Sequence, residues 1–184
     1  MEYLQSICVI GSSNTDMVIK GEKLPAPGET VLGGTFLMNP GGKGANQAVA
    51  AARLTRKQHD NDSSQLAMPV WFVANVGNDV FGQQARQQFE REGIKADFVT
   101  TDANEPSGVA LIGVDSRGEN CIMVASGANA KLRPAQVAVA LAAGNAHTVV
   151  LVQLETPINR RICHSRKPQA RDAGSAEPGP GPTD

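Results

Sequence analysis

The residues with the clearest potential for chemistry lie in a glycine-rich loop, residues 38–54, with the sequence MNPGGKGANQAVAAARL. Glycines let the backbone approach a ligand closely, and the alanine-rich segment predicts a helix whose N-terminal N–H groups point at whatever binds there. Lys43 adds three donors, and Asn46 offers a donor and an acceptor. Gly42, Lys43 and Asn46 are therefore candidate residues for binding an anion or a polyhydroxylated molecule. The alternative is a glycine turn that only packs the helix.

Spacing excludes two nucleotide-binding motifs from this loop. A Walker phosphate loop needs a glycine five positions before Gly42 and a hydroxyl residue after Lys43, where the sequence has leucine and glycine. A dinucleotide fingerprint would need a glycine at position 47, where Gln47 stands, and a buried strand before it. The loop is therefore not predicted to bind nucleotide phosphates.

A second group of polar side chains follows predicted buried strands. In GSSNTD, which follows the apolar run 7–10, Asn14 and Asp16 are two residues apart and point the same way if the segment is extended. Glu155 ends another apolar run. Ligands of open α/β sheets bind beyond the carboxyl ends of the strands, and an Asp–Asn pair can hold adjacent hydroxyl groups. Asn14, Asp16 and Glu155 are therefore candidate binding residues, and the alternative for residues 14–16 is a simple Asn/Asp turn.

The elements that must position these residues alternate between strands and helices. Apolar runs predict strands, and spacings of three and four residues predict helices. The strands are expected at residues 7–10, 70–77, 96–101 and 149–154, and the helices from Ala45, over residues 79–93 and from Pro134. This alternation predicts an α/β fold with a doubly wound, mainly parallel sheet.

Two pieces break the alternation and carry antiparallel signals. The first, residues 29–40, includes a short exposed strand predicted around residues 30–32. The second is a hairpin, with strands at residues 109–114 and 121–125 around the turn DSRGE. We expect them to form a small separate sheet from about residues 17–40 and 107–126.

Composition limits the class of protein. The formal net charge is −1, so no global field directs the chain to nucleic acid or an anionic membrane. No apolar run approaches the about 20 residues of a membrane span. The first residues show neither a basic segment nor a small-residue cleavage site, so no secretory signal is expected. Cys8, Cys121 and Cys163 fit neither a zinc site nor a disulfide framework, and the first two are expected to be buried. These features indicate the cytosol, and we expect the nucleus as an additional location.

The tail, residues 160–184, has almost no apolar side chains and predicts disorder. A doubly wound sheet would continue after the strand at 149–154 with a crossover helix and further strands, which the tail does not predict. We therefore expect the fold to be incomplete on its C-terminal side and the tail to be a truncated or alternatively read product. The polar residues 56–65 predict an exposed loop insertion.

Taken together, these segments resemble the ribokinase-like (PfkB) family of carbohydrate kinases. Seven of them occur in the family's order between about residues 7 and 157: GSSNTD, PAPGETV, NPGGKGANQAVAAARL, VGNDVFG, SGVALIGVDSRGEN, SGANAKL and QLETP. The glycine loop resembles the family's first signature, and GGKGANQAVA with QLETP is similar to its ribose-phosphorylating branch. The resemblance implies a doubly wound domain over residues 1–159, with a β-sheet lid that closes over the sugar and contributes to a homodimer.

The activity implied by the resemblance is ATP-dependent phosphorylation of D-ribose to D-ribose 5-phosphate, with Mg²⁺ and an activating K⁺. The lid face around Ile112 would cover the sugar and exclude water. The sugar contacts that the resemblance implies are Asn14, Asp16, Gly42, Lys43, Asn46 and Glu155.

One departure from the family concerns catalysis. The family's second signature, D-T-x-G-A-G-D, supplies the catalytic base and an anion hole, and this sequence lacks it. The ATP and potassium sites belong to the same part of the family. Because phosphoryl transfer depends on these groups, the resemblance implies a chain that keeps the ribose site and is inactive alone, and no residue here is assigned as catalytic. The alternative is an inactive sugar-binding or dimerisation partner of the full-length kinase.

Overall fold

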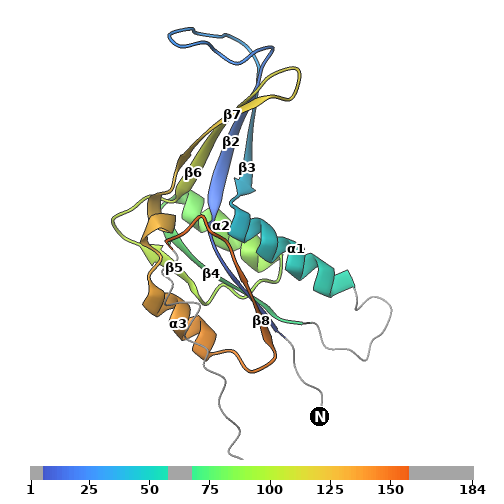
Figure 1. The fold of residues 1–184 in the computed structure, drawn as a ribbon, viewed down its shortest axis with the longest axis vertical. Helices are drawn as coiled ribbons and strands as arrows, with labels where there is room; N and C mark the ends of the chain where they lie inside the picture. Colours follow the sequence, from blue (N-terminus) through green and yellow to red (C-terminus); the bar gives the residue numbers. More distant parts are fainter. Residues whose placement is uncertain (1–5, 58–67, 158–184) are drawn as a thin grey trace, which may run out of the picture.

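The computed structural model describes residues 6–57 and 68–157 of the 184-residue chain, which form two four-stranded sheets with helices around one of them (Figure 1). None of the helices in these residues combines the length and apolar character that crossing a membrane requires. Three features expected from the sequence lie wholly or largely outside the described residues and remain predictions: the loop insertion at 56–65, the tail at 160–184 and the environment of Cys163.

The main sheet is entirely parallel, with strand order β5-β4-β1-β8. Helices cover both of its faces, since α1 and α2 pack on one side and α3 on the other (Figure 1). This arrangement confirms the predicted α/β fold with a doubly wound sheet. The elements are β1 (Ser6–Ile10), α1 (Lys43–Lys57), β4 (Val70–Gly77), α2 (Val80–Arg91), β5 (Val99–Asp102), α3 (Pro134–Ala142) and β8 (Thr148–Val152).

Small side chains hold α1 close to the sheet. Ala45, Ala48 and Ala52 are almost fully buried and pack in one cluster with Val9 and Phe72. Because alanines let the helix approach closely, the start of α1 lies near the carboxyl end of β1, where the candidate site residues lie. On the other face, α3 packs through a smaller cluster formed by Val137 and Ala140 with Cys8, Ile10 and Val73.

The second sheet has the order β3-β2-β6-β7 and projects away from the main sheet (Figure 1). Its outer pairs are antiparallel, which confirms the predicted separate sheet and the hairpin within it. The central pair, β2 with β6, is parallel, which the antiparallel signals did not indicate. The strands are β2 (Asn14–Lys20), β3 (Thr35–Gly41), β6 (Gly108–Val114) and β7 (Asn120–Ala125).

Two local predictions were wrong, and one alternative is excluded. The strand expected around residues 30–32 is absent, because the glycines at 33 and 34 take positive φ angles of 92° and 97° and β3 begins only at Thr35. Residues 14–16 are not a turn, because they pair with both β3 and β6. Cys121 is exposed, since it lies on the edge strand β7. The proline at position 40 is accommodated because β3 is an edge strand.

Candidate functional site

The glycine loop brings the start of α1 against the turn between β1 and β2. Gly42 has φ = 93°, and a side chain there would lie 2.8 Å from Ser12 O and from Asn14 N. The Ala45 N–H donates to Ser12 O at 2.9 Å. A methyl group on Gly44 would overlap the backbone of Gly11 at 2.6 Å. These glycines are therefore required by close backbone packing, which positions the helix N-terminus beside the first strand end.

Asn14 and Asp16 lie on the same face of β2, as their spacing predicts. Asn14 pairs with Gly41 in β3, and Asp16 pairs with Asn39. The Asp16 carboxylate lies directly over Gly41, where a side chain would overlap it. The two polar side chains thus share one face of the second sheet, next to the glycine loop.

Glu155 lies in the turn after β8 and links three parts of the site. Its Oε2 accepts hydrogen bonds from Ser12 Oγ at 2.6 Å and from the Lys43 N–H at 3.3 Å. Its Oε1 forms an ion pair with Lys43 Nζ at 3.0 Å. Glu155 therefore ties the β1–β2 turn and the first residue of α1 to the end of β8.

The two carboxylates influence each other's charge. Partial burial, and then the negative charge of Glu155, raise the pKa of Asp16. Burial alone would also raise the pKa of Glu155, but the hydrogen bonds from Ser12 and Lys43 outweigh it and lower that pKa. Because Lys43 is paired with Glu155, it does not neutralise the charge of Asp16 when Asp16 is ionised.

Asn46 lies in the first turn of α1 and is exposed. Its N–H donates to Gly42 O at 2.9 Å, and its side chain makes no hydrogen bond with the residues that the structure describes. The structure therefore brings five of the six predicted site residues into one connected group, and Asn46 adjoins it through the helix. Within residues 6–57 and 68–157, no cluster of three or more His, Cys, Asp or Glu side chains is arranged to hold a metal ion.

Sequence reasoning did not identify several residues that shape the site. Ser12 was part of a recognised segment, but its bond to Glu155 spans 143 residues and leaves no periodic signal. Asn129, in SGANAKL, binds the turn at Ser13 and Asn14 across 116 and 115 residues. Glycine at position 41 is required by the Asp16 carboxylate. None of these relationships could be found from local spacing.

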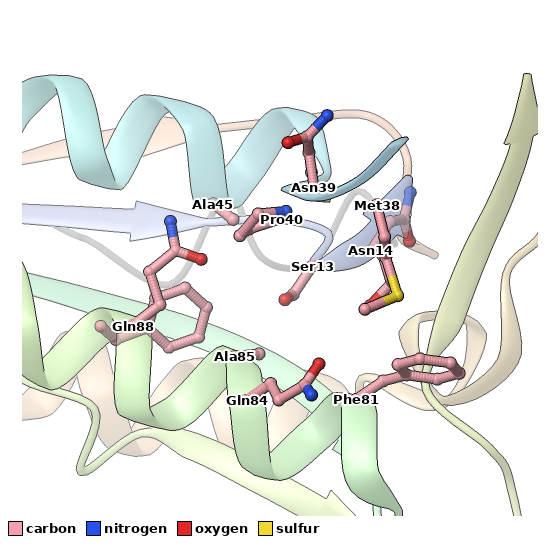
Figure 2. A pocket seen from close by; sticks show the side chains of 13 residues that line it. Ser13, Asn14, Met38, Asn39, Pro40, Ala45, Phe81, Gln84, Ala85 and Gln88 are labelled. Carbon is pink, nitrogen blue, oxygen red and sulfur yellow. The ribbon is translucent and has the colours of Figure 1, made fainter. Parts of the chain in front are cut away.

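A small cleft adjoins the start of β2 (Figure 2). It has a volume of about 70 Å³ and lies between the lower ends of β2 and β3 and the helix α2. Thr15 and Met38 line it from the second sheet, and Gln84 and Gln88 line it from α2. Asn14 and Gly41 also line this cleft, which therefore borders the candidate site.

Comparisons with known proteins agree with this architecture. The family described as pfkB family carbohydrate kinase matches residues 4–174. The ribokinase of Bacillus subtilis is 38% identical over 167 residues, which cover 88% of this chain and 53% of the relative. The ribokinase of Haemophilus influenzae is 38% identical over 155 residues, which cover 84% of this chain and 47% of the relative. The chain spans about half the length of these curated relatives.

Solved structures of similar proteins have the same fold over the described residues. The ribokinase of Giardia lamblia matches with a TM-score of 0.69 and 31% identity, covering 84% of this chain and 43% of that structure. The Arabidopsis thaliana ribokinase complexed with ribose and ATP matches with a TM-score of 0.64 and 30% identity, covering 84% of this chain and 47% of that structure.

Proposed function

The chain belongs to the pfkB family of carbohydrate kinases, and we propose that its described residues form the sugar site of a ribokinase-type enzyme. The observation that carries the proposal is the convergence of Asn14, Asp16 and the start of α1 at the carboxyl ends of β1 and β8. This is the edge at which ligands bind in open α/β sheets. The similarity to ribokinases over more than four-fifths of this chain supports ribose as the sugar.

The electrostatics of the site favour a neutral ligand with hydroxyl groups over an anion. Lys43 is already paired with Glu155, and Asp16 carries a carboxylate whose pKa is raised by burial and by Glu155. An anionic phosphate would add repulsion to this arrangement. A sugar hydroxyl can instead donate to the carboxylate, which accepts hydrogen bonds without a change in net charge.

Each residue has a distinct proposed role. Asp16 accepts hydrogen bonds from one or two ribose hydroxyls, and Asn14 binds a neighbouring hydroxyl. Gly42 packs against the β1–β2 turn and contacts the sugar through its main chain, and Asn46 contacts it from the first turn of α1. Glu155 holds Lys43 and the turn at Ser12 in place and lies beside the bound sugar.

The proposed reaction is transfer of a phosphoryl group from ATP to the 5-hydroxyl of D-ribose, with Mg²⁺ and an activating K⁺. ATP and the metal ions supply the phosphoryl group and stabilise its charge during transfer. We assign none of the described residues to ATP, to a metal ion or to the base that removes the hydroxyl proton. We therefore propose that the 184-residue chain alone binds ribose and does not phosphorylate it.

The second sheet is proposed to act as a lid over the sugar and as a contact with a second copy. Ile112 and Leu37 lie on the same face as Asp16 and can cover a bound sugar. The opposite face presents a continuous exposed apolar surface, which supports self-association because such surfaces mark interaction sites. Its members, with exposed fractions between 46% and 68%, are Ile19, Phe36, Met38, Leu111 and Met123.

The alternative function is an inactive sugar-binding or dimerisation partner of a full-length kinase, and the same apolar face favours it. Copurification of the tagged chain with the full-length enzyme would support this alternative. A chain that stays monomeric and binds no full-length enzyme at micromolar concentration would contradict it.

Two measurements on the 184-residue chain test the main proposal. Isothermal titration calorimetry with D-ribose is expected to give saturable binding, weakened at least about tenfold by Asp16→Asn. Lys20→Gln, on the same face but at the far end of β2, is the matched control and is expected to leave the affinity unchanged. An assay for ribose 5-phosphate with ATP, Mg²⁺ and K⁺ is expected to show no turnover. Ribose binding that is absent, or equal in Asp16→Asn, would contradict the proposed site.

A further inference from the structure

We infer that Asn129 is a positioning residue that holds the Asn14 side chain in its binding orientation, with Gly108 providing the space for their hydrogen bond. The inference rests on the proposed function, because it takes Asn14 to be a sugar contact. Asn129 lies in the short 3-10 helix η1 (Gly127–Lys131) and is only 1% exposed.

The Asn129 carboxamide is fully occupied by the turn that carries Asn14. Its Oδ1 accepts the Ser13 N–H at 2.8 Å. Its Nδ2 donates to Ser13 O at 3.0 Å and to Asn14 Oδ1 at 2.8 Å. Because the Ser13 backbone presents a donor to one side of the amide and an acceptor to the other, only one orientation of the Asn129 amide satisfies all three bonds.

This contact determines what Asn14 presents to a ligand. Its Oδ1 already accepts a hydrogen bond from Asn129, so its NH₂ group is the part of the amide that remains for the ligand. Asp16, on the same face of β2, is an acceptor when ionised. The pair therefore presents a donor and an acceptor side by side, which suits two neighbouring hydroxyl groups, one accepting from Asn14 and the other donating to Asp16.

Gly108 gives independent support for this assignment. It is paired with Asn14 across β2 and β6, and a methyl group there would overlap both Asn129 Nδ2 and Asn14 Oδ1. Its φ angle lies outside the left-handed region, so the backbone itself does not require glycine. The absence of a side chain at position 108 thus serves the Asn129–Asn14 hydrogen bond.

A buried anchor holds η1 in place. Asn75, in β4 and 3% exposed, donates through Nδ2 to Ala128 O at 3.0 Å. The Ala128 N–H donates to Pro106 O at 2.8 Å. The helix η1 is therefore fixed to the main sheet through Asn75, and its Asn129 is hydrogen-bonded to the β1–β2 turn. This arrangement suits Asn129 to orient the Asn14 side chain.

The test uses the 184-residue chain and compares Gly108→Ala with Gly113→Ala. Gly113 lies on the same strand, and a methyl group there would meet only the flexible end of Leu24 at 3.1 Å and one other atom at 4.0 Å. Asn129→Ala and Asn14→Ala complete a double-mutant cycle. The readouts are the side-chain NH₂ signals of Asn14 in ¹H–¹⁵N NMR spectra without sugar, assigned by their loss in Asn14→Ala, and the Kd for D-ribose.

Gly108→Ala and Asn129→Ala are expected to shift the Asn14 NH₂ signals and to raise the Kd at least about tenfold, whereas Gly113→Ala changes neither. In the Asn14→Ala background, Asn129→Ala is expected to have little further effect on the Kd, which a merely structural role would not produce. Unmoved Asn14 signals in both variants, or additive effects on the Kd, would overturn the inference. If the unsubstituted chain binds no ribose, the proposed function fails, and the NMR signals still decide whether Asn129 positions Asn14.

Discussion

The carboxylate of Asp16 lies directly over Gly41, the residue that ends β3, so that any side chain at position 41 would occupy the same space as the carboxylate. The two residues come from neighbouring antiparallel strands whose register pairs Asp16 with Asn39 and Asn14 with Gly41. The last residue of β3 therefore leaves the space in which the acceptor of the proposed sugar site is held.

Gly41→Ala is expected to displace the Asp16 carboxylate and to weaken D-ribose binding at least about tenfold, because the hydroxyl partner of Asp16 is lost. The measurement is a calorimetric titration of the 184-residue chain. Gly21→Ala is the matched control, since Gly21 lies just after β2 and a methyl group there has no neighbour closer than 3.7 Å. Equal affinity in Gly41→Ala and Gly21→Ala would show that the position of Asp16 does not matter for the sugar.

Sugar binding is expected to weaken in acid at a higher pH than an ordinary aspartate would dictate. Burial and then the charge of Glu155 raise the pKa of Asp16, and protonation removes the carboxylate acceptor. Glu155→Gln removes the negative charge that helps to raise the pKa of Asp16, so the pH midpoint of ribose binding is expected to fall. The measurement is the Kd for ribose from pH 3 to pH 8 in both proteins, with Glu119→Gln, in the exposed turn before β7, as the control. An unchanged or higher midpoint in Glu155→Gln would contradict the coupling of the two carboxylates.

Asp79 is expected to contribute stability that disappears in acid. Its Oδ1 accepts from the Gly82 N–H at 2.8 Å and from Ser107 Oγ at 2.6 Å, and its Oδ2 accepts from the Ser107 N–H at 2.7 Å. Although burial opposes them, these bonds lower the pKa of Asp79. A carboxyl group whose pKa is lower in the folded state stabilises the protein above its unfolded pKa of about 3.9 and loses this effect as the pH falls through the folded pKa.

Asp79→Asn is therefore expected to lower the free energy of unfolding by about 1–3 kcal/mol at pH 7. The difference from the unsubstituted chain is expected to shrink between about pH 4 and pH 2. Urea unfolding over this pH range measures it, with Asp97→Asn, an exposed carboxylate before β5, as the control. A difference that stays constant with pH would exclude the ionised carboxylate as its source.

Much of the main sheet could be predicted from the sequence because its signals are local. Buried parallel strands are continuous apolar runs, as at 70–77, and the helix α1 shows its packing face through alanines three and four residues apart. The second sheet was harder to predict. Its edge strands β3 and β7 are exposed on both faces, so burial leaves a weak pattern there. The start of β3 is decided by two positive-φ glycines and by its pairing with β2.

The same distinction applies to the site. The proximity of Asn14, Asp16 and Glu155 could be predicted because strand alternation and the position of strand ends are visible in the sequence. The pairing of Lys43 with Glu155 and the contact of Asn129 with Asn14 could not, because each joins segments more than 100 residues apart. The sequence therefore predicted which side chains lie close together. It did not predict which of them form hydrogen bonds or ion pairs with each other in the absence of a ligand.

The most direct test of the account is to locate ribose on the chain by NMR. D-ribose is titrated into the ¹⁵N-labelled 184-residue chain, and the shifts of backbone and side-chain amide signals are followed. The account predicts that the shifts concentrate at Asn14, Asp16, Gly42, Lys43 and Asn46, while Gln84 and Gln88, which line the neighbouring cleft from α2, stay unchanged. Shifts that concentrate on Gln84 and Gln88, or no shifts at millimolar ribose, would contradict the central claim that these residues form the sugar site.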